Sequence, residues 1–169
     1  MSEQVDHSTN PTFRGKISMF LLTISICLML VSTIIPKWSQ LKNKNMNLWI
    51  ECEDNICETI DDIWTTDYKI LYTSIAIISY IFAFAAVPFL LSHVMYHRTR
   101  MGIKRKISLI SATILVLLSG VLMIISTSFY KTRHDALDYK SGEALHLAMA
   151  SGIIEIISAT YAILEIVTF

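Results

Sequence analysis

The sequence predicts an all-α membrane protein with four transmembrane helices. The 169 residues are 53% hydrophobic and only 17% charged, and the mean hydropathy of +0.52 lies well above that of a soluble domain. The apolar residues fall into four long blocks separated by compact charged segments, as in a polytopic membrane protein. The net charge is zero, and no basic face with interleaved aromatic residues points to nucleic acid.

The first apolar block, Ile17–Ile35, follows a polar segment, residues 1–13, which we expect to be a disordered cytoplasmic tail. As a helix, this uncharged block would span about 28 Å, close to the roughly 30 Å of a bilayer's hydrocarbon core. A cleaved signal peptide is the alternative, but the block is too long and lacks a small-residue cleavage site. Cys27 lies inside the block and is expected to be a small buried residue.

A long polar loop, residues 36–69, separates the first block from the second and carries four Lys against seven Asp or Glu. Cys52 and Cys57 lie in this loop. A zinc site needs four ligands and the loop contains no His, so we expect a disulfide, which requires the oxidising side of a membrane. Asn47–Cys52 has the composition of a strand. The acidic stretch is expected to be a solvated face rather than a cation site.

Two further blocks and their connections follow. The second block, residues 70–94, contains Pro88, which is expected to kink its helix. The next connection, residues 95–106, has five Lys or Arg and no acid, whereas the third block, residues 107–129, is uncharged. The second polar loop, residues 130–143, mixes three basic with three acidic residues.

The fourth block, residues 144–169, is expected to span the bilayer although it contains two Glu residues. Small residues recur along one side of this predicted helix, which favours close packing against other helices. They are Ala148, Gly152, Ala159 and Ala162.

Glu155 lies near the centre of this block and on the same helical side as the small residues. No Lys or Arg occurs at comparable depth in another block, so we expect a protonated acid that donates a hydrogen bond to a neighbouring helix. Tyr80 and Ser119 have a suitable depth. The alternative is a proton or ion pathway, in which His93 or His146 would take part, although both histidines lie near the ends of blocks.

The orientation follows from the distribution of Lys and Arg near the blocks. Residues 95–106 carry five such residues, which predicts a cytoplasmic connection. Four spans then place both termini in the cytoplasm and both polar loops outside, as Arg14 and Lys16 also indicate. This argument does not use the cysteines, and it also places Cys52 and Cys57 on the oxidising side of the membrane.

The combination of Trp38, Leu48-Trp49, Cys52 and Cys57 resembles the signature of the claudin superfamily, which lies in the first extracellular loop of a four-helix membrane protein. Ten residues separate the two Trp and four separate the two Cys. This spacing is most similar to the branch of the peripheral myelin protein, the epithelial membrane proteins and the lens fibre membrane protein. The motif covers residues 38–57.

The resemblance implies a left-handed four-helix bundle with a small extracellular antiparallel β-sheet from the first loop. Trp38 and the Leu48-Trp49 pair would pack this sheet onto the outer end of the bundle. The alternative for Trp38 is a simple interfacial aromatic residue. Lys69 matches a position, at the entry to the second span, where these families commonly carry a basic residue.

Three functions are consistent with this sequence. The first is a non-enzymatic protein of the plasma membrane that organises cell–cell contacts, cell junctions or membrane domains. The second is an auxiliary subunit of an ion channel, and the third is a small transporter that uses Glu155. We expect no enzymatic activity, no cofactor and no metal. The expected partners are membrane lipids and other membrane proteins, including further copies in a lateral homo-oligomer, and not nucleic acid.

Overall fold

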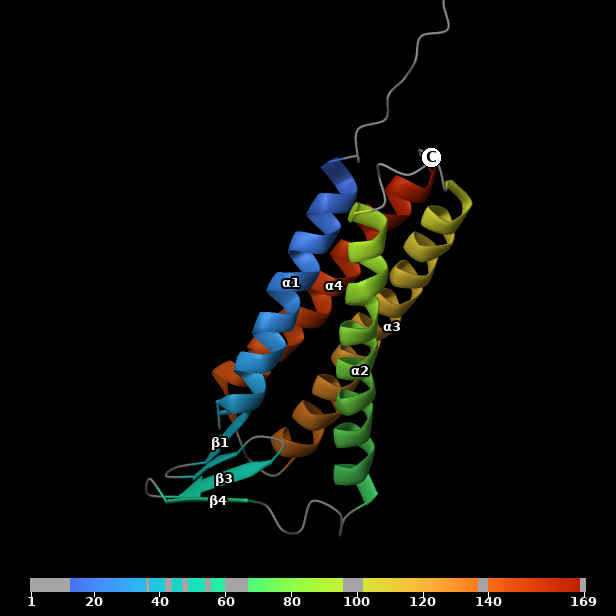
Figure 1. The fold of residues 1–169 in the computed structure, drawn as a ribbon. Coiled ribbons are helices and arrows are strands. Elements are labelled where there is room, and N and C mark those ends of the chain that lie inside the picture. The colour runs from blue at the N-terminus through green and yellow to red at the C-terminus, as the bar shows by residue number, and fades with distance from the viewer. Residues whose placement is uncertain are drawn as a thin grey trace, which may run out of the picture.

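The computed structural model describes residues 13–35, 37–41, 44–46, 49–53, 56–59, 67–95, 102–136 and 140–167. Four helices form a bundle: α1 (Phe13–Ile34), α2 (Asp67–Met95), α3 (Gly102–Asp135) and α4 (Glu143–Val167). A small antiparallel sheet lies at one end of this bundle (Figure 1), which we call the sheet end. The fold is therefore the predicted helical bundle with a small β-sheet.

The side chains are distributed as in a membrane protein. Each helix contains a stretch of 22 to 30 residues that is long and apolar enough to cross a bilayer. Large apolar side chains such as Phe20, Ile81 and Ile114 face outward and are 65%, 58% and 54% exposed. The interior instead holds many small or hydroxyl-bearing residues. A surface of this kind is compatible with lipid and not with water.

Two helix pairs are joined by serine hydroxyls. Helix α1 packs along α4, where the hydroxyls of Ser18 and Ser158 lie 3.0 Å apart. Helix α2 packs along α3, where Ser79 Oγ donates to the Ser119 carbonyl oxygen at 2.9 Å. The pairs meet mainly through α3 and α4, and the contact between α1 and α2 is smaller. Interhelical hydrogen bonds are a usual means of association where the surroundings are already apolar.

Helix α3 extends beyond the predicted span at both ends, and continues six residues past Phe129 to Asp135. Tyr130 and His134 explain the extension, because they are one helical turn apart and both are buried. Helix α2 continues through Pro88 to Met95, although a proline removes one helical hydrogen bond.

The sheet has five strands in the order β4-β3-β2-β1-β5, with every neighbouring pair antiparallel. Four strands come from the loop between α1 and α2: β1 (Ser39–Leu41), β2 (Lys44–Met46), β3 (Ile50–Glu53) and β4 (Ile56–Thr59). The fifth strand, β5 (Lys140–Ser141), comes from the connection between α3 and α4 and pairs with β1. The sheet therefore joins both connections at this end of the bundle.

Two apolar clusters fill the bundle. The sheet-end cluster includes Trp38, Tyr72 and Tyr130 together with alanines of α2 and α4. The second cluster includes Leu22 and Leu109, and belongs to the opposite end. Along α4 the division between them falls between Ala148 and Ala159, which is the segment that contains Glu155.

Candidate functional site

Trp38 joins the sheet to the bundle through three hydrogen bonds. Its backbone N–H donates to the Met46 carbonyl oxygen at 2.7 Å, and its own carbonyl oxygen accepts from the Gly142 N–H at 2.8 Å. The indole Nε1 donates to the Ser32 carbonyl oxygen at 2.7 Å, near the end of α1. The side chain is completely buried. Trp38 is therefore a core residue that connects β2, the residue after β5 and α1, and not a simple interfacial aromatic residue.

An aromatic cluster surrounds the Trp38 ring. The ring of Tyr130 lies edge-on to Trp38 and to Tyr72, with both pairs of ring centroids 5.1 Å apart. The His134 ring also packs edge-on against Tyr130, at 4.0 Å. The Tyr130 hydroxyl lies 3.0 Å from Ser39 Oγ on β1. Edge-to-face contacts add to the free energy of apolar burial, so α2, α3 and β1 all hold this corner of the fold.

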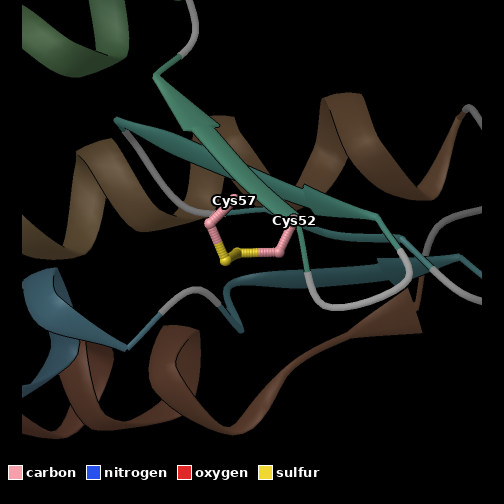
Figure 2. Close-up of a disulfide and its surroundings, with 2 residues drawn as sticks. All are labelled: Cys52 and Cys57. Carbon is pink, nitrogen blue, oxygen red and sulfur yellow. A yellow bond between two sulfur atoms is a disulfide. The ribbon is translucent and has the colours of Figure 1, made fainter.

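The predicted disulfide joins two neighbouring strands. Cys52 on β3 and Cys57 on β4 are opposite each other in the strand register, with their Cα atoms 4.1 Å apart and their sulfur atoms bonded. Figure 2 shows the bond crossing between these strands. Cys27 is different, because this free cysteine on α1 is exposed on the outer side of the bundle. The expectation that Cys27 is buried was wrong: an apolar run predicts a span, but not which of its faces meets lipid.

The other signature residues are placed only in part. Trp49 is partly buried and packs against the sheet-end cluster, as expected for a residue that seats the sheet on the bundle. Leu48 lies outside the described residues. Lys69 is in the first turn of α2, and its side chain lies outside the described part of the structure.

Gly142 allows β5 to approach β1, and the sequence analysis missed it. A Cβ atom at this position would collide with the Lys37 carbonyl group, which belongs to the backbone and has no room to move. The same Lys37 oxygen accepts a hydrogen bond from the Ala144 N–H at 3.1 Å. A single Gly before a predicted helix was the available signal, but only the pairing of two distant segments makes the need for Gly clear.

The small-residue side of α4 is buried as predicted, and Gly152 is its closest contact. A Cβ atom on Gly152 would lie 3.0 Å from the Gly120 carbonyl oxygen, and one on Gly120 would lie 2.8 Å from the Gly152 oxygen. Ala148, Ala159 and Ala162 are at most 1% exposed. The α3–α4 crossing therefore depends on two glycines. Gly120 was missed, although small residues recur every seven positions around it, at Thr113 and Thr127.

Glu155 is completely buried at the middle of the bundle. Its Oε1 atom accepts a hydrogen bond from Ser25 Oγ of α1 at 2.9 Å, a partner that the sequence analysis did not name. Ser18, Ser25 and Ser32 recur every seven residues along one side of α1, and all three are buried. That period was the signal that could have identified Ser25.

Of the two residues expected beside Glu155, Ser119 lies close to it, whereas Tyr80 lies closer to Ser32. The Ser119 hydroxyl lies close to the carboxyl group, but it donates to the Ser79 carbonyl oxygen at 2.8 Å. Tyr80 is within electrostatic range of Glu155 and close to Ser32. Within the described residues, neither Glu155 Oε2 nor the Tyr80 hydroxyl has a hydrogen-bond partner.

A second buried polar pair lies at the end of the bundle opposite the sheet. His93 Nε2 of α2 is 3.6 Å from Glu165 Oε1 of α4, and both side chains are at most 2% exposed. Gly15 of α1 packs against them, since a Cβ atom there would lie 3.3 Å from His93 Nε2. His146 is exposed near the start of α4, far along the helix from this pair. His93 and His146, the two histidines considered for a transport role, therefore lie far apart.

The fold and these contacts define a multi-pass membrane protein whose sheet is fixed to one end of a four-helix bundle. Among the residues that the structure describes, no group of three His, Cys, Asp or Glu side chains is arranged to hold a metal ion. No protein-family model matches the sequence, and a comparison with curated proteins finds no match.

Proposed function

We propose that the protein is a claudin-like, non-enzymatic membrane protein that organises cell–cell contacts or membrane domains through lateral contacts and through its sheet. The observation that carries this proposal is the position of Trp38. It is completely buried and hydrogen-bonded to β2, to Gly142 directly after β5 and to α1, so the sheet is held firmly on the bundle. A rigid surface loses little conformational entropy when it binds a partner.

In this proposal the sheet end faces the outside of the plasma membrane. The disulfide between Cys52 and Cys57 is expected to form on the oxidising side. Of the five Lys or Arg of residues 95–106, Arg98 and Arg100 lie between α2 and α3 in the sequence, and Lys104, Arg105 and Lys106 begin α3. The end of α2 and the start of α3 are at the end of the bundle opposite the sheet (Figure 1). The positive-inside rule then makes that end, and both termini, cytoplasmic.

The exposed edge of the sheet is the surface that would meet an opposing cell. Strand β4 is the last strand of the sheet, and its Ile56 side chain is 69% exposed. An unpaired strand edge with an exposed apolar side chain is able to add a strand or a side-chain contact from another molecule. Lateral partners would instead contact the apolar outer faces of the helices.

The experiment mixes two cell populations that express differently coloured tagged copies. Enrichment at contacts between two expressing cells, and not at contacts with a non-expressing cell, is expected. The variant Ile56→Lys should reduce this enrichment at equal surface amount, whereas Ala136→Lys, at the exposed end of α3, should not. Equal signal at all membranes would contradict an adhesive role, and co-purification with one channel complex would favour the auxiliary-subunit alternative.

A further inference from the structure

Basic residues are concentrated at the end of the bundle opposite the sheet, where α1 and α3 begin and α2 and α4 end (Figure 1). Five of the fourteen Lys and Arg residues of the chain lie within the first five residues of these two helices. They are Arg14 and Lys16 of α1 and Lys104, Arg105 and Lys106 of α3. Among the described residues, this end contains one acid, Glu165, which is buried against His93. The described part of this end therefore carries an excess of positive charge.

The positions of these charges oppose the helix dipoles. The first turn of a helix favours acids and the last turn favours bases, but neither α1 nor α3 has an acid in its first turn, and α4 has no base in its last turn. Arg14 offsets this in part, because its Nη1 donates to the Leu164 carbonyl oxygen near the end of α4 at 3.2 Å. The other basic residues add to the positive potential of two helix starts, and an anion outside the protein would lower that potential.

Two of these basic side chains lie at the level where the lipid-facing surface begins. Lys16 directly precedes the apolar run of α1 and Lys106 directly precedes that of α3, and both side chains are exposed. Ile107, the next residue of α3, is exposed as well. In a bilayer, the boundary between charged and apolar side chains is the level of the phospholipid headgroups. The anions within reach are therefore those of lipid headgroups.

We propose that this end of the bundle, which we call the basic end, binds the headgroups of anionic phospholipids such as phosphatidylserine. Each Lys or Arg close to an anionic bilayer surface strengthens such binding. Helices α1 and α3 belong to different helix pairs, so their basic residues form a surface and not one pocket. Several singly charged headgroups therefore fit this surface better than one multiply charged ligand.

This surface is independent of the proposed function, because adhesion through the sheet does not require a particular lipid at the opposite end. The proposed orientation would place the basic end in the cytoplasmic leaflet, which is the anionic one. Binding in a symmetric bilayer does not depend on that orientation. The paired-cell experiment and a lipid-binding experiment therefore fail or succeed separately.

The test places the full-length protein in nanodiscs of phosphatidylcholine, alone or mixed with phosphatidylserine, and measures the midpoint of thermal unfolding. The midpoint should be higher with phosphatidylserine, because a ligand that binds the folded state stabilises it, and this rise should shrink at high salt. The double variant Lys16→Gln, Lys106→Gln should lose about half of the rise. The matched control Lys131→Gln, Lys140→Gln removes two exposed lysines at the sheet end and should keep it.

A second readout counts the bound lipids. After the mixed nanodiscs are dissolved in mild detergent, mass spectrometry should find phosphatidylserine retained on the parent protein severalfold more than phosphatidylcholine. This preference should fall in Lys16→Gln, Lys106→Gln and not in the control. If that variant fails to fold, Lys106→Gln compared with Lys131→Gln decides.

Two results would overturn the proposal. Equal retention of both lipids by the parent protein, or equal loss of the preference in both double variants, would show that the basic end does not bind anionic lipids. The basic residues would then serve only to orient the chain during insertion. If soluble inositol hexakisphosphate raises the midpoint in phosphatidylcholine nanodiscs as much as phosphatidylserine does, the surface takes a soluble anion and the proposal of a lipid ligand is wrong.

Discussion

The indole N–H of Trp38 and the carbonyl oxygen of Ser32 are 2.7 Å apart, and this hydrogen bond joins the first residues of the sheet region to the last turn of α1. The carbonyl groups in the last turn of a helix have no partner within the helix. Trp38 therefore satisfies a helix end and positions the sheet with the same side chain.

Trp38→Ala should destabilise the fold more than any other single change at the sheet end. Loss of a completely buried Trp typically costs about 3–5 kcal/mol, and the Ser32 carbonyl oxygen would also lose its donor. Trp38→Phe keeps most of the volume and should cost less, on the order of 1–2 kcal/mol. Thermal unfolding in detergent measures both. Equal stability of the Ala and Phe variants would show that the apolar volume does not matter.

Cys52→Ser or Cys57→Ser should destabilise the sheet by about 2 kcal/mol, the value expected for a bridge that closes so short a loop. We expect partial retention inside the cell, because total stability is only about 5–15 kcal/mol. The double variant has no free thiol and separates loss of the bridge from mispairing. Surface biotinylation measures delivery. Normal delivery of both single variants would contradict a structural role for the disulfide.

The proposed orientation predicts which cysteines react from outside an intact cell. After mild reduction, a membrane-impermeant maleimide should label Cys52 and Cys57, whereas Cys27 in the middle of α1 should stay unlabelled. A protease site introduced at residue 101 should be protected until the membrane is permeabilised. Cleavage at residue 101 in intact cells would reverse the orientation.

Substitutions of glycine by alanine should follow the space available at each site. Gly142→Ala forces a side-chain atom into the backbone of Lys37 and should prevent the β1–β5 pairing. Gly120→Ala and Gly152→Ala face a neighbouring carbonyl oxygen at 2.8 and 3.0 Å, and overpacking of this kind costs about 1–3 kcal/mol. Gly15→Ala, with its nearest atom at 3.3 Å on a side chain, is the mild control. Thermal unfolding should rank the four variants in this order.

Glu155→Lys should fail to reach the cell surface. A Lys at mid-bilayer costs about 2.5–3.5 kcal/mol in membrane insertion, and it would remove the carboxyl group that accepts from Ser25. Glu155→Gln keeps the shape and an acceptor, so its surface amount should be nearly normal. Retention of both variants to the same extent would mean that folding requires the carboxyl group itself, since Gln has the same shape as Glu. If Glu155→Gln reaches the surface but loses activity, the transporter alternative would replace our proposal.

The sequence predicted much of this fold because membrane spans and strand composition are local signals. The four apolar blocks correspond to the four helices, and Cys52 and Cys57 form a disulfide between neighbouring strands. The pairing of β1 with β5 was not predictable in this way, since Ser39 and Ser141 belong to different connections and their pairing depends on the whole bundle. The extension of α3 to Asp135 was also missed, because Tyr130 is held by Trp38 and Ser39 of distant segments and His134 packs on Tyr130.

The candidate site was likewise predictable where the signal is local and not where it depends on how the helices pack. The spacing of small residues along α4 indicated that Glu155 would face other helices, and its side chain is completely buried in the structure. The identity of its partner, Ser25, depends on how α1 is rotated against α4. The seven-residue repeat of Ser18, Ser25 and Ser32 marks the buried side of α1, but it does not say which of these serines lies at the depth of Glu155.

The pairing of β1 with β5 also constrains the order of events during synthesis. Strand β1 is made early, but the residues that cover its edge, Lys140 and Ser141, leave the ribosome roughly a hundred residues later. Until then β1 presents an open edge that is able to pair with other chains. The sheet therefore closes only after α3 has been synthesised, so its completion reports that the first three helices have been made.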